Sequence, residues 1–238
     1  MDIDGISPRM LESGFYNMDC MDGMAQFPDK FFDLCLTDPP YGVNLPYNTY
    51  NDTEENWYKL MTRAVPEMIR VSKMAIFPSC QIKRLGWFYA NFPPDWIMCW
   101  NKGSTGCAGH IGFNDWEPLL VYGKSKSNLF MHDVINITPN EKMGNHNHPC
   151  PKPLSWAKWI ISRATAKGDK VIDPFTGSGT SAIACHQLQR QFWGFELDPD
   201  YFNAATERLN KVKAQVSMTE LIEQVIPEQV TIGGEHEH

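Results

Sequence analysis

Apolar runs and amphipathic segments alternate along most of the chain. Short apolar runs have the length and composition of buried strands. They lie at 15–18, 31–36, 74–77, 96–100, 119–122, 171–173 and 192–196. Apolar residues at helical spacing are found at 20–27, 54–71, 81–91, 153–167, 180–188 and 199–209. This alternation predicts an α/β fold with a mostly parallel, seven-stranded sheet and helices on both faces.

Two long stretches show neither the strand period nor the helical period of apolar residues. Residues 101–115 and 123–148 are rich in Gly, Ser, Asn and His, and irregular chain of this length inside a domain is usually functional or disordered. No internal repeat or linker divides the chain, so we expect a single domain over residues 1–216 with these two loops inserted. From residue 217 the sequence is acidic and weakly patterned, which predicts a flexible tail over 217–238.

The composition of the chain says more about the compartment in which the protein works than about its function. The chain has 238 residues, a net charge of −7 and seven Cys. An odd number of scattered Cys is typical of reduced thiols, and neither a signal peptide nor a membrane-spanning run is seen. We therefore expect a cytoplasmic protein. The acidic balance argues mildly against nucleic acid, but residues 101–152 are near neutral, so DNA binding is permitted.

The first candidate site is the segment Asp38-Pro39-Pro40-Tyr41. An apolar strand precedes it, and the two prolines end that strand because they cannot donate to a sheet ladder. Asp38 is thereby fixed at the carboxyl end of a strand, where open α/β sheets bind ligands. The polar and aromatic residues at 43–51 are expected to form a loop over this edge.

The second candidate site is the glycine loop at 173–180, between a strand and a helix. Gly177 and Gly179 permit close approach of a ligand, and the helix start offers amide donors to an anion. The loop lacks the Lys of a phosphate loop and the third Gly of a dinucleotide loop. Glu196 ends the next strand, where a carboxylate can bind ribose hydroxyls. A ribose-bearing ligand with an anionic end fits this pattern, and S-adenosylmethionine is such a ligand.

Four separated segments together resemble one family. Asp38-Pro39-Pro40-Tyr41, the loop Asp-Pro-Phe-x-Gly-Ser-Gly-Thr at 173–180, His-Pro-x-x-Lys-Pro at 148–153 and Asn-Met-Asp-Cys at 17–20 resemble the DNA amino-methyltransferases, which methylate exocyclic amines of bases. The segment 116–124 also resembles this family. The catalytic motif precedes the cofactor motif, an order that marks the permuted beta class. Met18 stands where Gly is usual in the family.

The resemblance implies a methyltransferase fold of the Rossmann-like type, with S-adenosylmethionine as cofactor. It implies that the Asp38 carboxylate and the Pro39 carbonyl accept hydrogens of the target amine, and that Tyr41 stacks on a base flipped out of the duplex. Pro40 completes the catalytic set. The implied cofactor-binding residues are Asp19, Lys152, Asp173, Pro174, Phe175, Gly177, Ser178, Gly179, Thr180 and Glu196.

Plainer interpretations stay open for several of these residues. Asp19 can cap the next helix, Lys152 can be a solvated charge and Phe175 can belong to the core. Pro149-Cys150 looks like the nucleophile of cytosine carbon-5 methyltransferases, but the other motifs of that family are absent. His146, His148 and Cys150 do not have standard zinc spacing, so no metal site is expected.

The function expected from these features is adenine-specific DNA methylation, in a restriction-modification setting of a prokaryote or phage. Asp at position 38 favours adenine, since cytosine-amine enzymes of the family more often have Ser there. Methylation of the cytosine amine, a non-catalytic DNA-binding subunit and an RNA or protein methyltransferase are the alternatives. Double-stranded DNA is the expected partner, with a homodimer as one arrangement. Lys102, Lys124 and Lys126 are expected to contact DNA phosphates from loops flanking the Asp38 edge.

Overall fold

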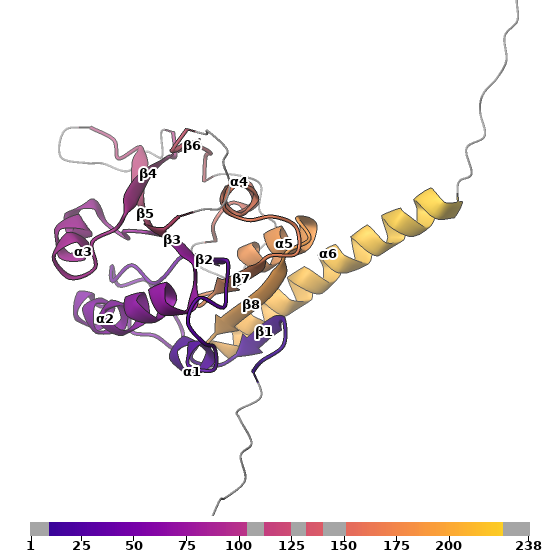
Figure 1. Ribbon diagram of the computed structural model, residues 1–238, viewed down its shortest axis with the longest axis horizontal. Coiled ribbons are helices and arrows are strands. Elements are labelled where there is room, and N and C mark those ends of the chain that lie inside the picture. Colours follow the sequence, from indigo (N-terminus) through magenta and orange to yellow (C-terminus); the bar gives the residue numbers. More distant parts are fainter. Residues whose placement is uncertain (1–9, 104–111, 125–131, 140–150, 226–238) are drawn as a thin grey trace, which may run out of the picture.

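A single mixed sheet forms the centre of the molecule. The computed structural model describes residues 10–103, 112–124, 132–139 and 151–225 (Figure 1). The strands are β1 (Gly14–Asn17), β2 (Leu34–Leu36), β3 (Met74–Pro78), β4 (Trp96–Asn101), β5 (Trp116–Gly123), β6 (Val134–Asn136), β7 (Lys170–Asp173) and β8 (Gln191–Glu196). Their order in the sheet is β1-β8-β7-β2-β3-β5-β4-β6.

The sheet is mostly parallel, as the sequence predicts. Among the described strands, β5 alone runs against its neighbours, pairing antiparallel with both β3 and β4. The other pairs are parallel, including the central contact between β2 and β7. Because parallel strands end at the same edge, the segments that follow β2, β7 and β8 meet there.

Helices cover both faces of the sheet (Figure 1). They are α1 (Cys20–Met24), α2 (Glu54–Val71), the 3-10 turn η1 (Ile82–Arg84), α3 (Leu85–Asn91), α4 (Leu154–Ala164), α5 (Thr180–Gln187) and α6 (Pro199–Val225). One face carries α1, α2 and α3, and the other carries α4, α5 and α6. In the ranges that the structure describes, no helix is both long and apolar enough to span a membrane.

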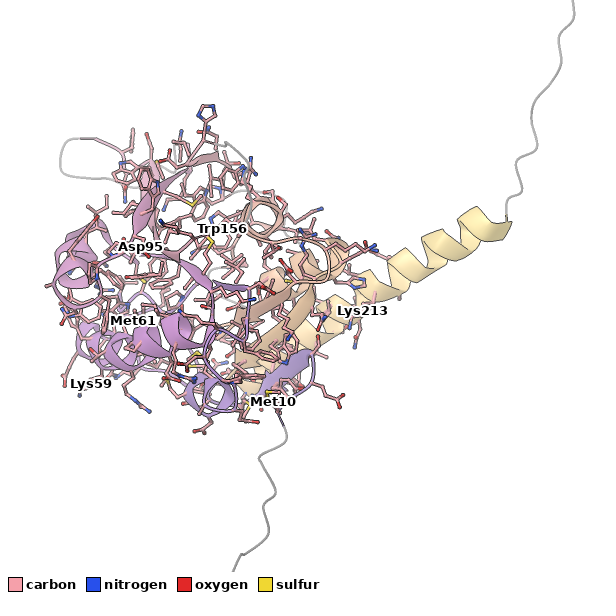
Figure 2. The ribbon with its side chains drawn as sticks, in the orientation of Figure 1. Met10, Lys59, Met61, Asp95, Trp156 and Lys213 are labelled. Carbon is pink, nitrogen blue, oxygen red and sulfur yellow. The ribbon has the colours of Figure 1, made fainter. Side chains whose placement is uncertain are left out.

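Each face of the sheet has its own apolar core. Trp57, Met61 and Met68 of α2 belong to one core, and Trp156 and Ile160 of α4 belong to the other. Figure 2 labels one residue of each, Met61 and Trp156. Strand β2 shows the consequence for the sequence, because its middle residue enters the first core and its two flanking leucines enter the second. A strand buried on both faces has no polar alternation.

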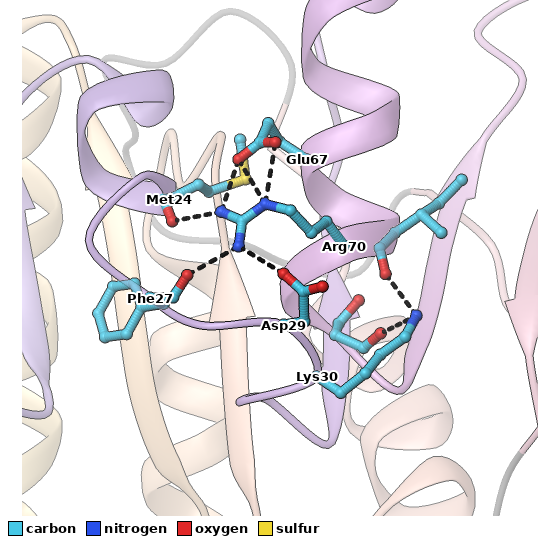
Figure 3. Close-up of polar contacts among 8 residues, drawn as sticks. Met24, Phe27, Asp29, Lys30, Glu67 and Arg70 are labelled. Carbon is cyan, nitrogen blue, oxygen red and sulfur yellow. Dashed lines mark hydrogen bonds and ion pairs between the residues drawn. The ribbon is translucent and has the colours of Figure 1, made fainter.

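Arg70 of α2 fixes the segment that leads from α1 into β2 (Figure 3). Its guanidinium donates hydrogen bonds to the carbonyl oxygens of Met24 at 3.1 Å and Phe27 at 2.8 Å. It also forms ion pairs with Asp29 at 3.1 Å and Glu67 at 2.7 Å. This one side chain therefore sets how the chain enters the strand that carries Asp38.

Several elements differ from the sequence predictions. The sheet has eight strands because β6 pairs with β4, and the prediction missed β6 because only Ile135 of its three residues is buried. The helix predicted over 81–91 is split into η1 and α3. Helix α6 continues to Val225, past the predicted start of the tail at 217. After Pro199 it contains no Gly or Pro, so helix propensity sustains it where apolar periodicity is weak.

Candidate active site

The two candidate sites of the sequence meet because β2 and β7 are neighbours. Leu34 pairs with Val171, and Cys35 pairs with Ile172. Just beyond the paired residues, the hydroxyl of Thr37 donates a hydrogen bond of 2.5 Å to Oδ1 of Asp173. The Asp-Pro-Pro-Tyr segment after β2 and the glycine loop after β7 thus share one edge, as expected.

Asp38 has one engaged and one available carboxylate oxygen. Its Oδ2 lies 2.8 Å from Nζ of Lys152, which is itself only 9% exposed. Its Oδ1 is buried and has no hydrogen-bond partner among the described residues. Burial raises the pKa of Asp38, the ammonium of Lys152 opposes that rise, and the nearby charge of Glu117 adds to it. A half-satisfied buried carboxylate is costly unless a ligand completes it.

Tyr41 is held by its hydroxyl group. The hydroxyl donates to Oε1 of Glu117 at 2.7 Å and accepts from Nζ of Lys152 at 2.9 Å. Burial, followed by the charges of Asp38 and Glu117, raises its pKa well above the usual range. Tyr41 lines a hollow whose walls also include Lys102 and Glu117. The expected stacking of Tyr41 on a base stays a prediction.

Two buried charges shape the turn after Tyr41. The guanidinium of Arg84 donates hydrogen bonds to the carbonyl oxygens of Tyr41 and Gly42. The carboxylate of Asp52 accepts from the amides of Gly42 at 2.6 Å and Val43 at 3.0 Å, and from a third amide further along. Gly42 has φ +61°, and a Cβ there would lie 2.8 Å from the Arg84 guanidinium. No pattern in the sequence pointed to this role of Arg84.

Asp173 holds the start of the glycine loop by hydrogen bonds to its carboxylate. Its carboxylate accepts from the hydroxyl of Thr37, from the amide of Phe175 at 3.1 Å and from the hydroxyl of Ser181. Burial raises its pKa to about 6, although these hydrogen bonds oppose the rise. The loop then turns through Gly177 and Gly179, which have φ of 50° and 79°.

The amino end of α5 lies at the cavity, which Thr180 and Ser181 line. Its cap residue, Gly179, has no side chain that could accept hydrogen bonds from the first amides of the helix. Thr180 is held by its hydroxyl, which donates to the carbonyl of Lys152 at 3.2 Å. Ser178 lies within 3.2 Å of the same hydroxyl. An anionic group fits at such a helix start.

Glu196 closes the loop from the end of β8. Its Oε2 accepts from the amide of Gly177 at 2.8 Å, and its Oε1 accepts from the amide of Asp198 at 2.9 Å. Burial raises its pKa, and these backbone donors oppose the rise. Each oxygen keeps capacity for a further hydrogen bond, because a carboxylate offers about four acceptor positions.

These groups surround one cavity of about 250 Å³. The predicted residues that line it are Asp19, Asp38, Pro40, Lys152, Asp173, Pro174, Phe175, Gly177, Ser178, Thr180 and Glu196. Pro39, Tyr41 and Gly179 lie next to lining residues but are not part of the wall. Sequence reasoning missed Met18, Thr37, Tyr47, Tyr50, Trp156, Asp198 and Tyr201, which also line the cavity.

Two predicted residues have contacts that favour a plainer or a different role. Asp19 caps α1, since its Oδ1 accepts from the amide of Met21 at 2.7 Å, while it also lines the cavity. The ammonium of Lys152 lies on Asp38 and Tyr41, rather than at the start of α5 where a cofactor carboxylate is expected.

The lysines predicted to contact DNA do not share one edge. Lys102 follows β4 on the Asp38 side of the sheet, where it forms an ion pair of 3.2 Å with Glu117. Lys124 follows β5, whose last residue Gly123 pairs with Met74 at the start of β3. The prediction that Lys124 flanks the Asp38 edge is therefore wrong, because β5 runs antiparallel. Lys126 lies outside the described residues.

Residues 140–150 are not described either, so the expectations for His146, His148 and Cys150 are untested. Among the residues that the structure describes, no group of three or more His, Cys, Asp or Glu is placed to hold a metal ion.

Comparisons with known proteins agree with this geometry. Residues 114–207 match the model of the DNA methylase family of N6/N4 methyltransferases. The Escherichia coli (strain K12) protein YubD is 29% identical over 212 residues, covering 84% of this chain and 92% of its own. The type II methyltransferase M1.MboII of Moraxella bovis is 24% identical over 263 residues, covering 86% of this chain and 99% of its own.

Solved structures share the fold. The complex of M1.HpyAVI with S-adenosylmethionine has a TM-score of 0.57 at 24% identity, over 82% of this chain and 98% of that one. The cytosine-N4-specific PvuII DNA methyltransferase has a TM-score of 0.62 at 15% identity, over 87% and 93%. Sequence and fold point the same way: over residues 114–207 the chain matches the DNA methylase family of N6/N4 amino-methyltransferases, and over 86% of its length it is similar to type II methyltransferases.

Proposed function

We propose that this protein transfers a methyl group to the exocyclic amine of adenine in double-stranded DNA. The observation that carries the proposal is made at Asp38, which lines the cavity and whose buried Oδ1 has no hydrogen-bond partner among the described residues. An amine hydrogen of a base satisfies such an acceptor.

The cofactor is S-adenosylmethionine. The residues present fit it, because Glu196 offers acceptor positions for ribose hydroxyls and the open start of α5 offers amides for the carboxylate. When bound, the cofactor supplies an activated methyl group on a sulfonium sulfur. We assign Phe175, which lines the cavity, to the wall against the cofactor.

The protein's own groups would act on the amine. The nitrogen is a poor nucleophile because its electron pair is delocalised into the ring. Acceptance of one hydrogen by Asp38 and of the other by the Pro39 carbonyl would draw the nitrogen toward tetrahedral geometry. The bound cofactor would supply the methyl group, and the carboxylate of Asp38, already hydrogen-bonded to the amine, would take up the proton that the nitrogen loses on methylation. Positioning and electrostatics supply most of the rate enhancement.

The target base must leave the duplex to reach this cavity, at a cost of about a few kcal/mol. We place the DNA at the Asp38 edge, with Lys102 as a candidate phosphate contact there. The geometry gives no support for Lys124 in that role. A homodimer and a restriction partner stay predictions.

The residue at position 38 is the reason to propose adenine rather than cytosine, because Asp at this place of the motif resembles the motif of the adenine-specific enzymes. Both amines present the same two hydrogens, so the hydrogen-bonding argument serves either base. The similarity to a cytosine-N4-specific enzyme keeps the second base as the alternative.

The test is to incubate purified protein with S-adenosylmethionine and unmethylated duplex DNA, digest the DNA and identify the nucleosides by mass spectrometry. N6-methyladenine is the expected product, and the Asp38→Ala protein is the matched control. N4-methylcytosine would establish the alternative base. No methylated nucleoside from a folded, cofactor-binding protein would overturn DNA methylation.

A further inference from the structure

Tyr41 has one phenolic proton and two carboxylates near it. Its hydroxyl donates to Oε1 of Glu117 at 2.7 Å, and Lys152 links it to Asp38, because Nζ lies within hydrogen-bond distance of both the hydroxyl oxygen and Oδ2 of Asp38. A hydroxyl carries a single proton, so a strong bond to one carboxylate weakens the bond to the other. The position of this proton therefore decides whether the carboxylate of Asp38 can accept a hydrogen bond from the substrate amine.

Lys152 restricts the choice. Its ammonium lies 2.9 Å from the oxygen of Tyr41 and 2.8 Å from Oδ2 of Asp38. An ammonium can only donate, so the tyrosine oxygen accepts there and its own proton points elsewhere. Among the described residues, the carboxylate that accepts a hydrogen bond from that hydroxyl is Glu117.

Glu117 is held firmly in this position. It lies on β5, between Trp116 and Pro118, and is only 6% exposed. Its other oxygen, Oε2, lies 3.2 Å from Nζ of Lys102. A buried carboxylate is expensive unless it is paired and hydrogen-bonded, and Glu117 is both. The result is a continuous polar chain from Lys102 through Glu117, Tyr41 and Lys152 to Asp38.

We infer that Glu117 is a positioning residue for methyl transfer, because it holds the Tyr41 proton away from Asp38 and so leaves Oδ1 of Asp38 to accept from the substrate amine. This inference rests on the proposed function. Without Glu117 the proton can turn toward Asp38, which Lys152 holds beside the tyrosine hydroxyl, and the amine must then compete with Tyr41 for this carboxylate.

The main experiment replaces Glu117 in two backgrounds. In the parent protein, Glu117→Ala should lower kcat at least tenfold, while the KM for DNA and the Kd for S-adenosylmethionine change less than twofold. Glu117→Gln should recover part of the loss, because its amide oxygen still accepts from Tyr41. In a Tyr41→Phe background no phenolic proton exists, so Glu117→Ala should cost less than a further twofold.

The comparison between backgrounds is a double-mutant cycle, so it isolates the coupling of the two residues from their separate costs. Equal loss of kcat in the two backgrounds would overturn the inference and leave Glu117 with a structural role. Thermal unfolding monitors the fold of each variant. If Glu117→Ala does not fold, Glu117→Gln in the same two backgrounds makes the same comparison. A parent protein that methylates no DNA would refute the proposed function instead.

Discussion

The ammonium of Lys152 binds one oxygen of Asp38 at 2.8 Å, and the other oxygen has no hydrogen-bond partner among the described residues. The pair keeps a carboxylate charged in surroundings that favour its neutral form, because burial raises the pKa of Asp38 and Lys152 lowers it. The other titratable groups around Asp38 are Glu117, Tyr41, Cys80 and Asp173. A neutral Asp38 is a weaker acceptor for the target amine than an ionised one, so under the proposed function this balance sets the lower pH limit of the reaction.

Replacement of Lys152 by Met should move that limit upward. Without the ammonium the pKa of Asp38 rises further, so the acid limb of kcat against pH shifts to higher pH and activity falls most at low pH. The measurement is kcat over a pH series under saturating DNA and cofactor. An acid limb at the parent position would show that Lys152 does not govern the ionisation of Asp38.

Asp38→Ala should abolish methyl transfer and leave cofactor affinity within about threefold, because the cofactor's predicted contacts lie on the glycine loop and Glu196. Asp38→Asn is the matched variant of similar size, with one oxygen retained and the charge lost. Turnover is measured on DNA and affinity by calorimetry. Near-normal turnover of either variant would refute the assignment of Asp38.

Glu196→Gln should weaken cofactor binding about tenfold or more. A hydrogen bond to a charged group is worth about 1.5–3 kcal/mol, and 1.4 kcal/mol corresponds to a tenfold change in Kd. Gln keeps one acceptor for the amide of Gly177, so the loop is disturbed less than by Ala. Calorimetry measures the Kd, and an unchanged value would make Glu196 a support of the loop alone.

Asp173 should make the folded state less stable as the pH rises from about 4 to about 6. Its pKa is about 6 in the folded protein and near 3.8 in the unfolded chain, so the folded state binds more protons within that window. The group's contribution to the free energy of unfolding then falls by about 2–3 kcal/mol across it. Asp173→Asn should flatten this dependence in denaturant titrations at several pH values. The same slope in parent and variant would assign it to other groups.

Arg70→Ala should destabilise the fold without changing the chemistry at the site. The side chain is 29% exposed and ties two carbonyl oxygens and two carboxylates, so a loss of about 1–3 kcal/mol in the free energy of unfolding is expected. Lys59→Ala is the control, because Lys59 forms an exposed pair with Glu55 on the same helix and should matter little. Equal effects of the two changes would mean that the Arg70 contacts contribute nothing specific.

Much of the architecture follows from local pattern. The apolar content of β2, β3, β7 and β8, and the prolines after β2, are sufficient to place Asp38, Asp173 and Glu196 at strand ends. Since parallel strands share an edge, their side chains were expected together, and the cavity brings them together. The overhanging loop at 43–51 also contributes Tyr47 and Tyr50 to the wall.

The direction of β5 could not be predicted from the pattern of apolar and polar residues. Nothing in its apolar run distinguishes a parallel from an antiparallel partner, and that direction decides on which edge Lys124 lies. The role of Glu117 was equally hidden, because its contacts to Tyr41 and Lys102 join residues far apart in sequence. A buried carboxylate in a strand gives no sign of its partners before the strands are assembled.

The adjacency of β2 and β7 has a consequence for the nascent chain. Thr37 and Asp173 touch although 136 positions separate them. During synthesis, the Asp-Pro-Pro-Tyr segment leaves the ribosome long before β7 and β8. The pocket proposed for the cofactor can therefore form only after these two later strands have emerged. The same adjacency makes the order of the two segments immaterial to the finished pocket. A gene rearranged to encode the cofactor half first could build the same pocket, provided that both strands still lie side by side.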